Sequence, residues 1–450
     1  MKQKTLLAIN ILKMLNNKYY GPNSQKLLTI YKTLIRSKLD YGSIVYASAS
    51  DRLLQALEPV QNASLHLALG AFPTTPTRSL QALTGIPPLS YRRKVLKINY
   101  TINCITKLHL DPKIPIFHDL TTHTSQNLNT KARNILQFLP PELPPWKPSP
   151  IEVIWNLSHF KGKPSKNIIE EVDKIIEKHS AWICCFVDGS KSLTGTGGAH
   201  LIDTELNSYS LPEVSSPNTA EQLAIYQCLL SLPTDTYSKF LIFSDSEASL
   251  KKLQLHQTQL EDTLISHILY SVLQIQNSGN QIKFVWIPSH QKIIGHDIAD
   301  ASAKSASGPS LGLINPTDLR VHLRHLLQNK WEIEWQQQIN KLRQIKPDVR
   351  NWSEIIGNAC QKSRHLETCI NRIYFGHSVI THQHLYLRQP PPICNVCNQT
   401  QLTIQHLIEE CPSYNTQRRI LAPKFPENIS IKNIHKLIEF VKSTKLMSKL

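Results

Sequence analysis

Long apolar runs are missing from this 450-residue sequence, and no stretch approaches the roughly 18 residues that a membrane span needs. Residues 1–21 have too short an apolar stretch and no small-residue cleavage site, so a secretory signal is not expected. Their apolar spacing predicts an amphipathic helix instead. We therefore expect no membrane association and a location inside the cell, in the nucleus, the cytoplasm or both.

Cysteine is also sparse, with nine residues in the whole chain. An odd number without a secretory signal argues against a disulfide framework and for a reducing compartment. Six cysteines are scattered, whereas Cys394, Cys397 and Cys411 lie close together in the sequence. This clustering leaves room for one metal site.

Acidic residues are outnumbered, because 33 Asp and Glu stand against 50 Lys and Arg, a formal net charge of +17. Such an excess favours a polyanionic partner, with nucleic acid ahead of a membrane surface. Charge that serves only solubility would give the same count, so composition alone does not decide between the two.

Periodicity and composition divide the chain into four segments. Residues 1–140 carry apolar side chains at helical spacing. Residues 141–179 are predicted to be a Pro-rich linker and a lead-in helix. Residues 180–308 alternate strand and helix patterns, and residues 309–450 return to helices. The predicted fold class is α/β in the middle, flanked by α-helical segments and a small metal-binding tail.

The middle segment twice shows an apolar strand that ends on an acid. The strand WICCFV delivers Asp188 into a Gly-Ser-Lys turn, and the strand LIF ends at Asp245 before a helix. A buried strand that ends on an acid is costly unless the acid has a partner or a cation. Taken alone, Asp188 could simply cap its turn, because Asp is common there.

Three further polar residues of this segment lie at a helix start, after a strand or on a helix. Glu221 is predicted in the first turn of a helix capped by Asn218 or Thr219. His290 follows the strand QIKFVW, and Asp300 lies on the helix after it. A first-turn Glu is often only a surface charge, and a lone loop histidine is usually just exposed. Four acids that all lie at strand ends or on helices of one α/β segment are harder to explain as surface charges and caps.

Strand ends of an open α/β sheet converge on one crevice. Asp188 and Asp245 are therefore expected to meet there, with Glu221 and Asp300 reaching in from helices. Four carboxylates repel one another and resist ionising without a cation, which Mg²⁺ with its oxygen ligands supplies. Two such ions about 4 Å apart suit in-line displacement at a phosphodiester. The sequence predicts a metal-dependent site for phosphodiester chemistry.

The order of these five residues resembles the ribonuclease H family: Asp188, Glu221, Asp245, His290 and Asp300. The resemblance covers residues 180–308. It implies a mixed five-stranded sheet with helices and endonucleolytic cleavage of the RNA strand of RNA/DNA hybrids. It also implies Mg²⁺ or Mn²⁺ bound by the four acids. His290, on a mobile loop, would assist product release or carry a proton.

The same resemblance implies four contacts with nucleic acid: Ser190, Lys191, Asn218 and His296. Between His290 and Asp300 the family usually has a Gly-Asn-Glu turn, and His296 stands where that Asn contacts the nucleic-acid backbone. Two alternatives stay open. One is a catalytically decayed remnant of a retroelement that binds nucleic acid without cutting. The other is a transposase or integrase of the same fold, which needs a differently ordered set of acids.

Residues 28–93 are similar to the region after the polymerase core in Jockey-type non-LTR retrotransposons. The similarity implies a thumb-like helical region that holds the primer and template. Its basic residues could contact phosphates or be ordinary solvated helix charge: Lys32, Arg36, Lys38, Arg92, Arg93 and Lys94. No Asp-Asp dipeptide occurs in the chain, so we expect no polymerase activity. Retroelement RNA or a longer polyprotein would be further partners.

Three cysteines and one histidine have the spacing of a zinc site, Cys394-x2-Cys397-x8-His406-x4-Cys411. The alternative is a free or redox-active CxxC with a bystander histidine. The pattern resembles the C-terminal Cys-Cys-His-Cys element of Jockey-type retrotransposons, which implies Zn²⁺. Residues 388–420 look poor in large apolar side chains, so we expect metal binding to supply the free energy that orders them. Arg418 would then meet phosphates.

Overall fold

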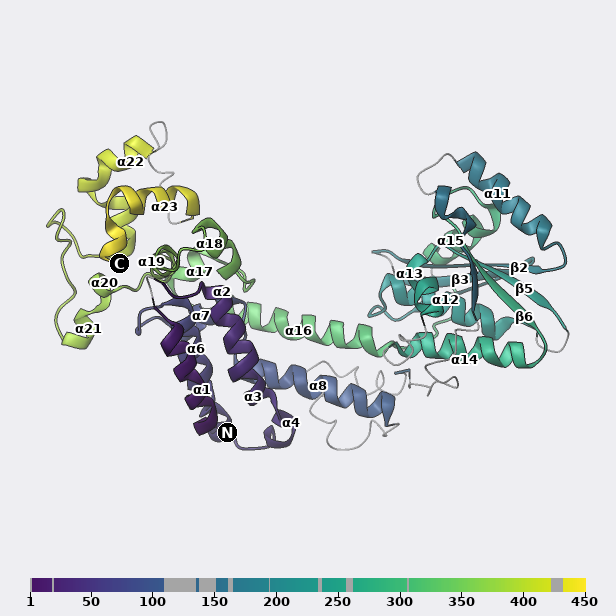
Figure 1. Ribbon diagram of the computed structural model, residues 1–450, viewed down its shortest axis with the longest axis horizontal. Coiled ribbons are helices and arrows are strands. Elements are labelled where there is room, and N and C mark those ends of the chain that lie inside the picture. Colours follow the sequence, from purple (N-terminus) through teal and green to yellow (C-terminus); the bar gives the residue numbers. More distant parts are fainter. Residues whose placement is uncertain are drawn as a thin grey trace. The chain divides into compact units, whose positions relative to one another are not determined.

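The computed structural model divides into two compact units, one of residues 1–97 and 326–450 and one of residues 98–325 (Figure 1). The residues that it describes are 2–17, 20–108, 135–136, 151–160, 165–193, 195–233, 237–255, 262–305, 307–421 and 432–450. Most of the predicted Pro-rich linker lies outside them. Within these ranges no helix combines the length and the apolar character that crossing a bilayer requires.

A mixed sheet forms the centre of the unit of residues 98–325 (Figure 1). Its strands are β1 (Glu152–Ile154), β2 (Ile183–Lys191), β3 (Thr196–Ile202), β4 (Glu205–Leu211), β5 (Lys239–Ser244) and β6 (Gln281–Trp286). Their order is β1-β6-β5-β2-β3-β4. The first four strands of this order, from β1 to β2, pair in parallel with one another. Strands β2, β3 and β4 form an antiparallel meander.

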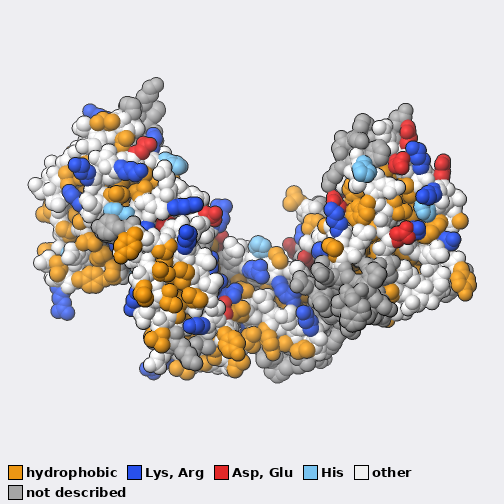
Figure 2. Space-filling model, viewed as in Figure 1, with side chains coloured by type: hydrophobic (Ala, Val, Ile, Leu, Met, Phe, Trp, Pro, Cys, Tyr) orange, Lys and Arg blue, Asp and Glu red, His pale blue; other side chains and the backbone are white. Residues whose placement is uncertain are grey.

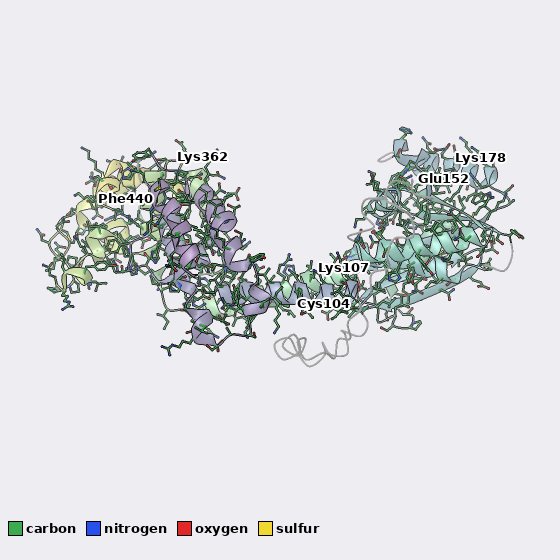
Figure 3. The ribbon with its side chains drawn as sticks, turned by 60° about the horizontal axis from the view of Figure 1, so that its bottom comes forward. Cys104, Lys107, Glu152, Lys178, Lys362 and Phe440 are labelled. Atoms are coloured by element: carbon green, nitrogen blue, oxygen red, sulfur yellow. The ribbon has the colours of Figure 1, made fainter. Side chains whose placement is uncertain are left out.

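The sheet has six strands, so the predicted five-stranded sheet is wrong by one. The additional strand, β1, comes from the segment that composition predicted to be linker and lead-in helix. It pairs in parallel with β6, and Lys283 of β6 forms an ion pair with Glu152 at 2.8 Å. Figure 3 labels Glu152 on this strand. Three residues are too few for an alternating pattern, so periodicity could not reveal β1.

Among the described residues, five α-helices pack with this sheet: α11 (Ser165–Lys178), α12 (Pro217–Ser231), α13 (Glu247–Gln254), α14 (Thr263–Asn277) and α15 (Ile294–Ser305). A short 3-10 helix, η3 (Asn156–Phe160), follows β1. Strand β5 is buried along almost its whole length, as expected of a parallel strand covered on both faces. Phe240, Phe243 and Phe284 are fully buried in this core.

Helix α12 begins earlier than the sequence indicated. Its cap is Ser216, whose hydroxyl accepts a hydrogen bond from the backbone N–H of Thr219 at 3.2 Å, so neither Asn218 nor Thr219 is the cap. The helix starts at Pro217, which suits the first helical position because it has no N–H to satisfy. Glu221 therefore lies beyond the first turn.

The unit of residues 1–97 and 326–450 is built from helices. On the N-terminal side these are α1 (Lys2–Leu15), α2 (Ser24–Ile30), η1 (Tyr31–Arg36), α3 (Ser37–Asp40), α4 (Ser43–Tyr46), α5 (Asp51–Gln55), α6 (Glu58–Leu69) and α7 (Thr77–Thr84). On the C-terminal side they are α17 (Lys341–Ile345), α18 (Ser353–Ala359), α19 (Arg364–Phe375), α20 (Val379–His382), α21 (His384–Leu387), η5 (His406–Glu410), η6 (Pro412–Tyr414), α22 (Asn415–Leu421), α23 (Ile434–Ser443) and η8 (Leu446–Ser448). Helices α8 (Leu89–Lys107) and α16 (Pro316–Gln336) each span the boundary between the units.

A buried arginine ties the two ends of the chain together in this unit. Arg364 of α19 donates to the carbonyl oxygens of Leu67 and Ala68 on α6, at 2.9 and 2.8 Å. Its charge is balanced by Glu367, 3.4 Å away and equally buried. Because a buried guanidinium is costly without such partners, this network fixes α19 against α6.

Some basic residues of the predicted phosphate-contacting face are paired within their own unit. Arg92 donates two hydrogen bonds to one carboxylate oxygen of Asp40, at 3.0 and 2.8 Å, and Arg93 lies 3.8 Å from Glu58. These contacts favour ordinary helix charge for the two arginines. Figure 2 shows other Lys and Arg side chains spread over the visible face of this unit.

One close approach in the sheet unit leads to a stability prediction. A Cβ on Gly189 of β2 would lie 2.2 Å from backbone atoms of Ala220 and Glu221 on α12. Backbone atoms cannot give way cheaply, so we expect Gly189→Ala to lower the free energy of unfolding by about 1–3 kcal/mol. Urea unfolding of the purified chain measures this. Ser190→Ala, one residue further on, adds no atoms and should stay close to wild type; equal stability of both variants would contradict the predicted contact.

Candidate active site

The parallel pairing of β2 with β5 brings two acids together. Phe186 lies opposite Phe243 in the register, and the two rings stack with centroids 4.7 Å apart. Asp188 and Asp245 each follow two residues later, on the same side of the sheet as these rings. Both carboxylates are largely buried, with 8% and 16% of their side chains exposed. The predicted meeting of these two strand ends is observed.

Glu221 and Asp300 approach the pair from α12 and α15. The Ser246 hydroxyl donates a hydrogen bond to a carboxylate oxygen of Glu221 and so fixes its orientation beside the end of β5. Asp300 accepts a bond of 2.6 Å from Lys304, one turn later on α15. The charges of Glu221 and Asp300 both act on Asp188, so the structure gathers all four predicted acids in one electrostatic environment.

This crowding changes the protonation of the acids. Burial and then the charge of Asp245 raise the pKa of Asp188 to about 7, against the opposing effect of His296. Burial also raises the pKa of Glu221, although the Ser246 hydroxyl acts the other way. Burial acts to raise the pKa of Asp245 as well, but His296 and other donors outweigh it, and the pKa is lowered. A carboxyl with a pKa near 7 is a group that a cation would ionise.

His296 differs from the predicted backbone contact with nucleic acid, because its side chain is 97% buried. Its Nε2 atom lies 3.6 Å from an oxygen of Asp245 and 4.0 Å from an oxygen of Asp188. Sequence reasoning named His296 as a nucleic-acid contact but did not predict its place among the acids. The available signal was spacing, since His296 precedes Asp300 by four residues, which puts both on one face of α15.

The remaining predicted residues lie around this group. His290 is exposed in the loop between β6 and α15 and has a positive φ of 57°, and it is not part of the acid cluster. Lys191 donates to the carbonyl oxygens of Glu213 and Ser215 at 2.9 and 2.7 Å, just before α12. Ser190 and Asn218 are half-buried. These positions stay predictions as nucleic-acid contacts.

A second group of possible metal ligands lies in the helical unit. Within the described residues, the ligand atoms of Cys394, Cys397, His406 and Cys411 all lie within 4.8 Å of one another. The sulfurs of Cys394 and Cys411 are 4.0 Å apart, and the sulfur of Cys397 is 3.3 Å from Nε2 of His406. Tetrahedral zinc with bonds of about 2.3 Å to sulfur and 2.0 Å to nitrogen separates its ligands by roughly 3.5–3.8 Å. The geometry fits one Zn²⁺.

Neighbouring groups support these four side chains. The backbone N–H of Cys394 donates to Thr400 at 2.8 Å, and that of Asn398 donates to Cys394, which closes the turn around the CxxC pair. The Thr400 hydroxyl lies 3.1 Å from Nδ1 of His406, so it can accept the ring proton while Nε2 faces the cysteines. Burial acts to raise the pKa of Cys397, but hydrogen bonds from Gln399 and His406 outweigh it and lower the pKa to about 6.

Two expectations for this tail are wrong. Arg418 is buried and donates to the carbonyl oxygens of Ile408 and Cys411, so it braces the cluster and does not face phosphates. The segment is also less poor in apolar contacts than composition indicated. Tyr414 packs edge-to-face on Phe440 of α23, a side chain labelled in Figure 3. Four further apolar side chains of the segment are buried: Leu402, Ile404, Leu407 and Ile408.

The sheet and its acid cluster define an α/β domain with a candidate metal site. Residues 179–308 match the family model for RNase H. The match contains β2 to β6 and all four clustered acids. Residues 179–308 are therefore similar to an RNase H domain, and the members of that family are nucleic-acid-binding hydrolases that act on RNA–DNA hybrids. A comparison with curated proteins found no match to the chain.

The raised pKa of Asp188 predicts a pH dependence of stability without metal. The ordinary value is 3.8 and the folded value is about 7, so between these pH values the folded protein binds more protons than the unfolded chain. The free energy of unfolding must then fall as pH rises through this window. The side chain of Asp188→Asn cannot ionise, so the contribution of this position to the decrease in the free energy of unfolding should be absent.

Thermal unfolding in EDTA, followed across this window, measures the difference between the two proteins. We expect the midpoint of Asp188→Asn to exceed that of wild type at neutral pH and to converge with it near pH 4. Asp203→Asn, an exposed acid in the turn after β3, serves as the control and should follow wild type. Identical profiles for Asp188→Asn and wild type would show that Asp188 titrates normally.

Proposed function

We propose that this chain hydrolyses the RNA strand of RNA/DNA hybrids endonucleolytically, with Mg²⁺ or Mn²⁺ bound by Asp188, Glu221, Asp245 and Asp300. The observation that carries the proposal is the buried pair Asp188 and Asp245 within an RNase H domain. The two carboxylates repel each other, and the pKa of Asp188 is raised to about 7. A divalent cation bound between them would remove this repulsion.

The chain's own residues have separable tasks in this reaction. Divalent cations at the acids would activate the attacking water and stabilise the leaving 3′ oxygen. Ser246 holds Glu221 in place and Lys304 holds Asp300, so both acids are oriented before substrate binds. His290 is exposed on its loop, where it can take up or release a proton near the scissile phosphate.

Strand choice follows from the shape of the substrate. A hybrid presents 2′-hydroxyl groups along one strand of a wide minor groove, and these distinguish RNA from DNA. Ser190, Asn218 and Lys191 lie at the end of β2 and the start of α12, beside the acids. Lys191 also holds the segment before α12 through two backbone carbonyls, which keeps this surface in place.

A binding protein without cleavage is the second candidate. It is favoured by His296, whose imidazole lies between two acids that a cation would otherwise bridge. Such a protein would bind hybrids with the salt dependence of phosphate contacts but release no product.

A cleavage assay with a labelled RNA/DNA hybrid separates these candidates. We expect cutting with Mg²⁺ or Mn²⁺, and a loss of at least about a hundredfold in Asp188→Asn and in Asp245→Asn, because each removes charge that acts on the transition state. Asp203→Asn is the matched control outside the cluster. Cutting by either site variant at the wild-type rate would refute the site, and binding without cutting in every metal would favour the second candidate.

We also propose a retroelement origin of Jockey type and a zinc ion at Cys394, Cys397, His406 and Cys411. The resemblance of residues 28–93 and the Cys-Cys-His-Cys spacing support the origin. The ligand separations, the Thr400 contact to His406 and the lowered pKa of Cys397 support zinc. Because the surrounding helices bury apolar side chains of their own, zinc should order the loop of the cysteines more than the whole unit.

Metal analysis of the full chain by mass spectrometry tests this site. We expect one zinc per chain, lost when Cys397 and Cys411 are both replaced by Ser. Cys184→Ser, a half-buried cysteine of β2, should keep the zinc. The double variant should lose protection from proteolysis around residues 394–411, while hybrid cleavage persists. Purified protein without metal, or zinc that survives the double replacement, would overturn the assignment.

A further inference from the structure

The start of α15 is held against the strands that carry the acids. A Cβ on Gly295 would lie 2.4 Å from the ring of Phe186, and that ring cannot swing away because it stacks on Phe243. Only glycine permits this approach. The next residue, His296, is thereby set directly over the acids that follow the two phenylalanines. Its location is imposed by backbone packing.

The separations at His296 are longer than those of a tight ion pair. A charged imidazole that pairs with a carboxylate donates a hydrogen bond of about 2.7–2.9 Å. Here Nε2 lies 3.6 Å from Asp245 and 4.0 Å from Asp188, so both separations exceed that length. One divalent ion with bonds of about 2.1 Å can join atoms up to roughly 4.2 Å apart. Both separations lie within that reach.

Glu221 and Asp300 are held by partners of their own. Ser246 donates to Glu221, and Lys304 donates to Asp300 at 2.6 Å. The compact set is defined by distance, because the ligand atoms of Asp188, Asp245 and His296 lie within 4.8 Å of one another. Nδ1 of His296 is buried and has no hydrogen-bond partner among the described residues, and Nε2 is the nitrogen that faces Asp188 and Asp245.

We propose that Nε2 of His296 binds the divalent cation together with Asp188 and Asp245, and that this nitrogen makes the site select Mn²⁺ over Mg²⁺. The proposal rests on the proposed function in that it concerns the same metal site. Mg²⁺ demands oxygen ligands and gives up water reluctantly. Mn²⁺ accepts an imidazole nitrogen more readily than Mg²⁺ does, although it binds such ligands the most weakly of the first-row transition metals.

Pulsed EPR of Mn²⁺ on the zinc-loaded full chain tests the nitrogen directly. We expect a coupling of the size of a directly bound imidazole nitrogen, which changes when the protein is labelled with ¹⁵N-histidine. His296→Asn should remove that coupling and weaken Mn²⁺ binding about tenfold or more, with Mg²⁺ binding changed by less than about threefold. His290→Asn removes an exposed imidazole six residues away and should keep the coupling.

Each contrary result overturns the proposal in a recognisable way. Bound Mn²⁺ without a nitrogen coupling would mean that His296 only neutralises the acids. A coupling that survives His296→Asn would assign the nitrogen to another residue, and an absence of Mn²⁺ binding would remove the site. The ¹⁵N label needs no substitution, so a variant that fails to fold leaves the test intact.

Activity separates this inference from the proposed function. Nitrogen coupling without hybrid cleavage in any metal would refute the proposed nuclease activity and leave the ligand assignment standing. Hybrid cleavage without nitrogen coupling would refute the assignment of His296 as a ligand and leave the proposed nuclease activity standing.

Discussion

The pairing of β2 with β5 is the constraint on which the site depends. It is a parallel pairing between strands buried in the core, and its register is fixed by the phenylalanines of both strands. A shift by one residue would move Phe186 and Phe243 to opposite faces of the sheet and end their stacking. The same register places Asp188 beside Asp245 at the ends of the two strands. The free energy gained by burying the apolar core therefore offsets the repulsion between these two carboxylates.

The helices reach this point through two close backbone contacts. Gly189 lets α12 approach the end of β2, and Gly295 lets α15 begin against Phe186. Gly189 faces the backbone of Glu221, and Gly295 precedes His296. Both of these polar side chains lie beside Asp188 and Asp245. The short motifs Asp-Gly-Ser and Gly-His-Asp thus have a steric meaning apart from their chemistry, because a side chain at either glycine would push a helix away.

Sequence reasoning predicted the elements that periodicity and strand ends determine. The strands that end at Asp188 and Asp245 were recognisable because long apolar runs stop at an acid, and parallel strands bring such ends together. It missed β1, whose three residues carry no pattern, and the true cap at Ser216, because several cap-forming residues stand in a row there. The buried place of His296 depends on how close α15 comes to Phe186, a distance that spacing along the chain does not contain.

Strand β1 has a practical consequence for anyone isolating the domain that matches the RNase H model. It lies at residues 152–154, ahead of the matched range 179–308, yet it covers the outer side of β6. A fragment cut at residue 179 would leave the amide and carbonyl groups of β6 facing solvent along an apolar strand. Exposed edges of that kind recruit other chains, so such a fragment is prone to self-association. An expression fragment that begins before residue 151 retains its own protective edge.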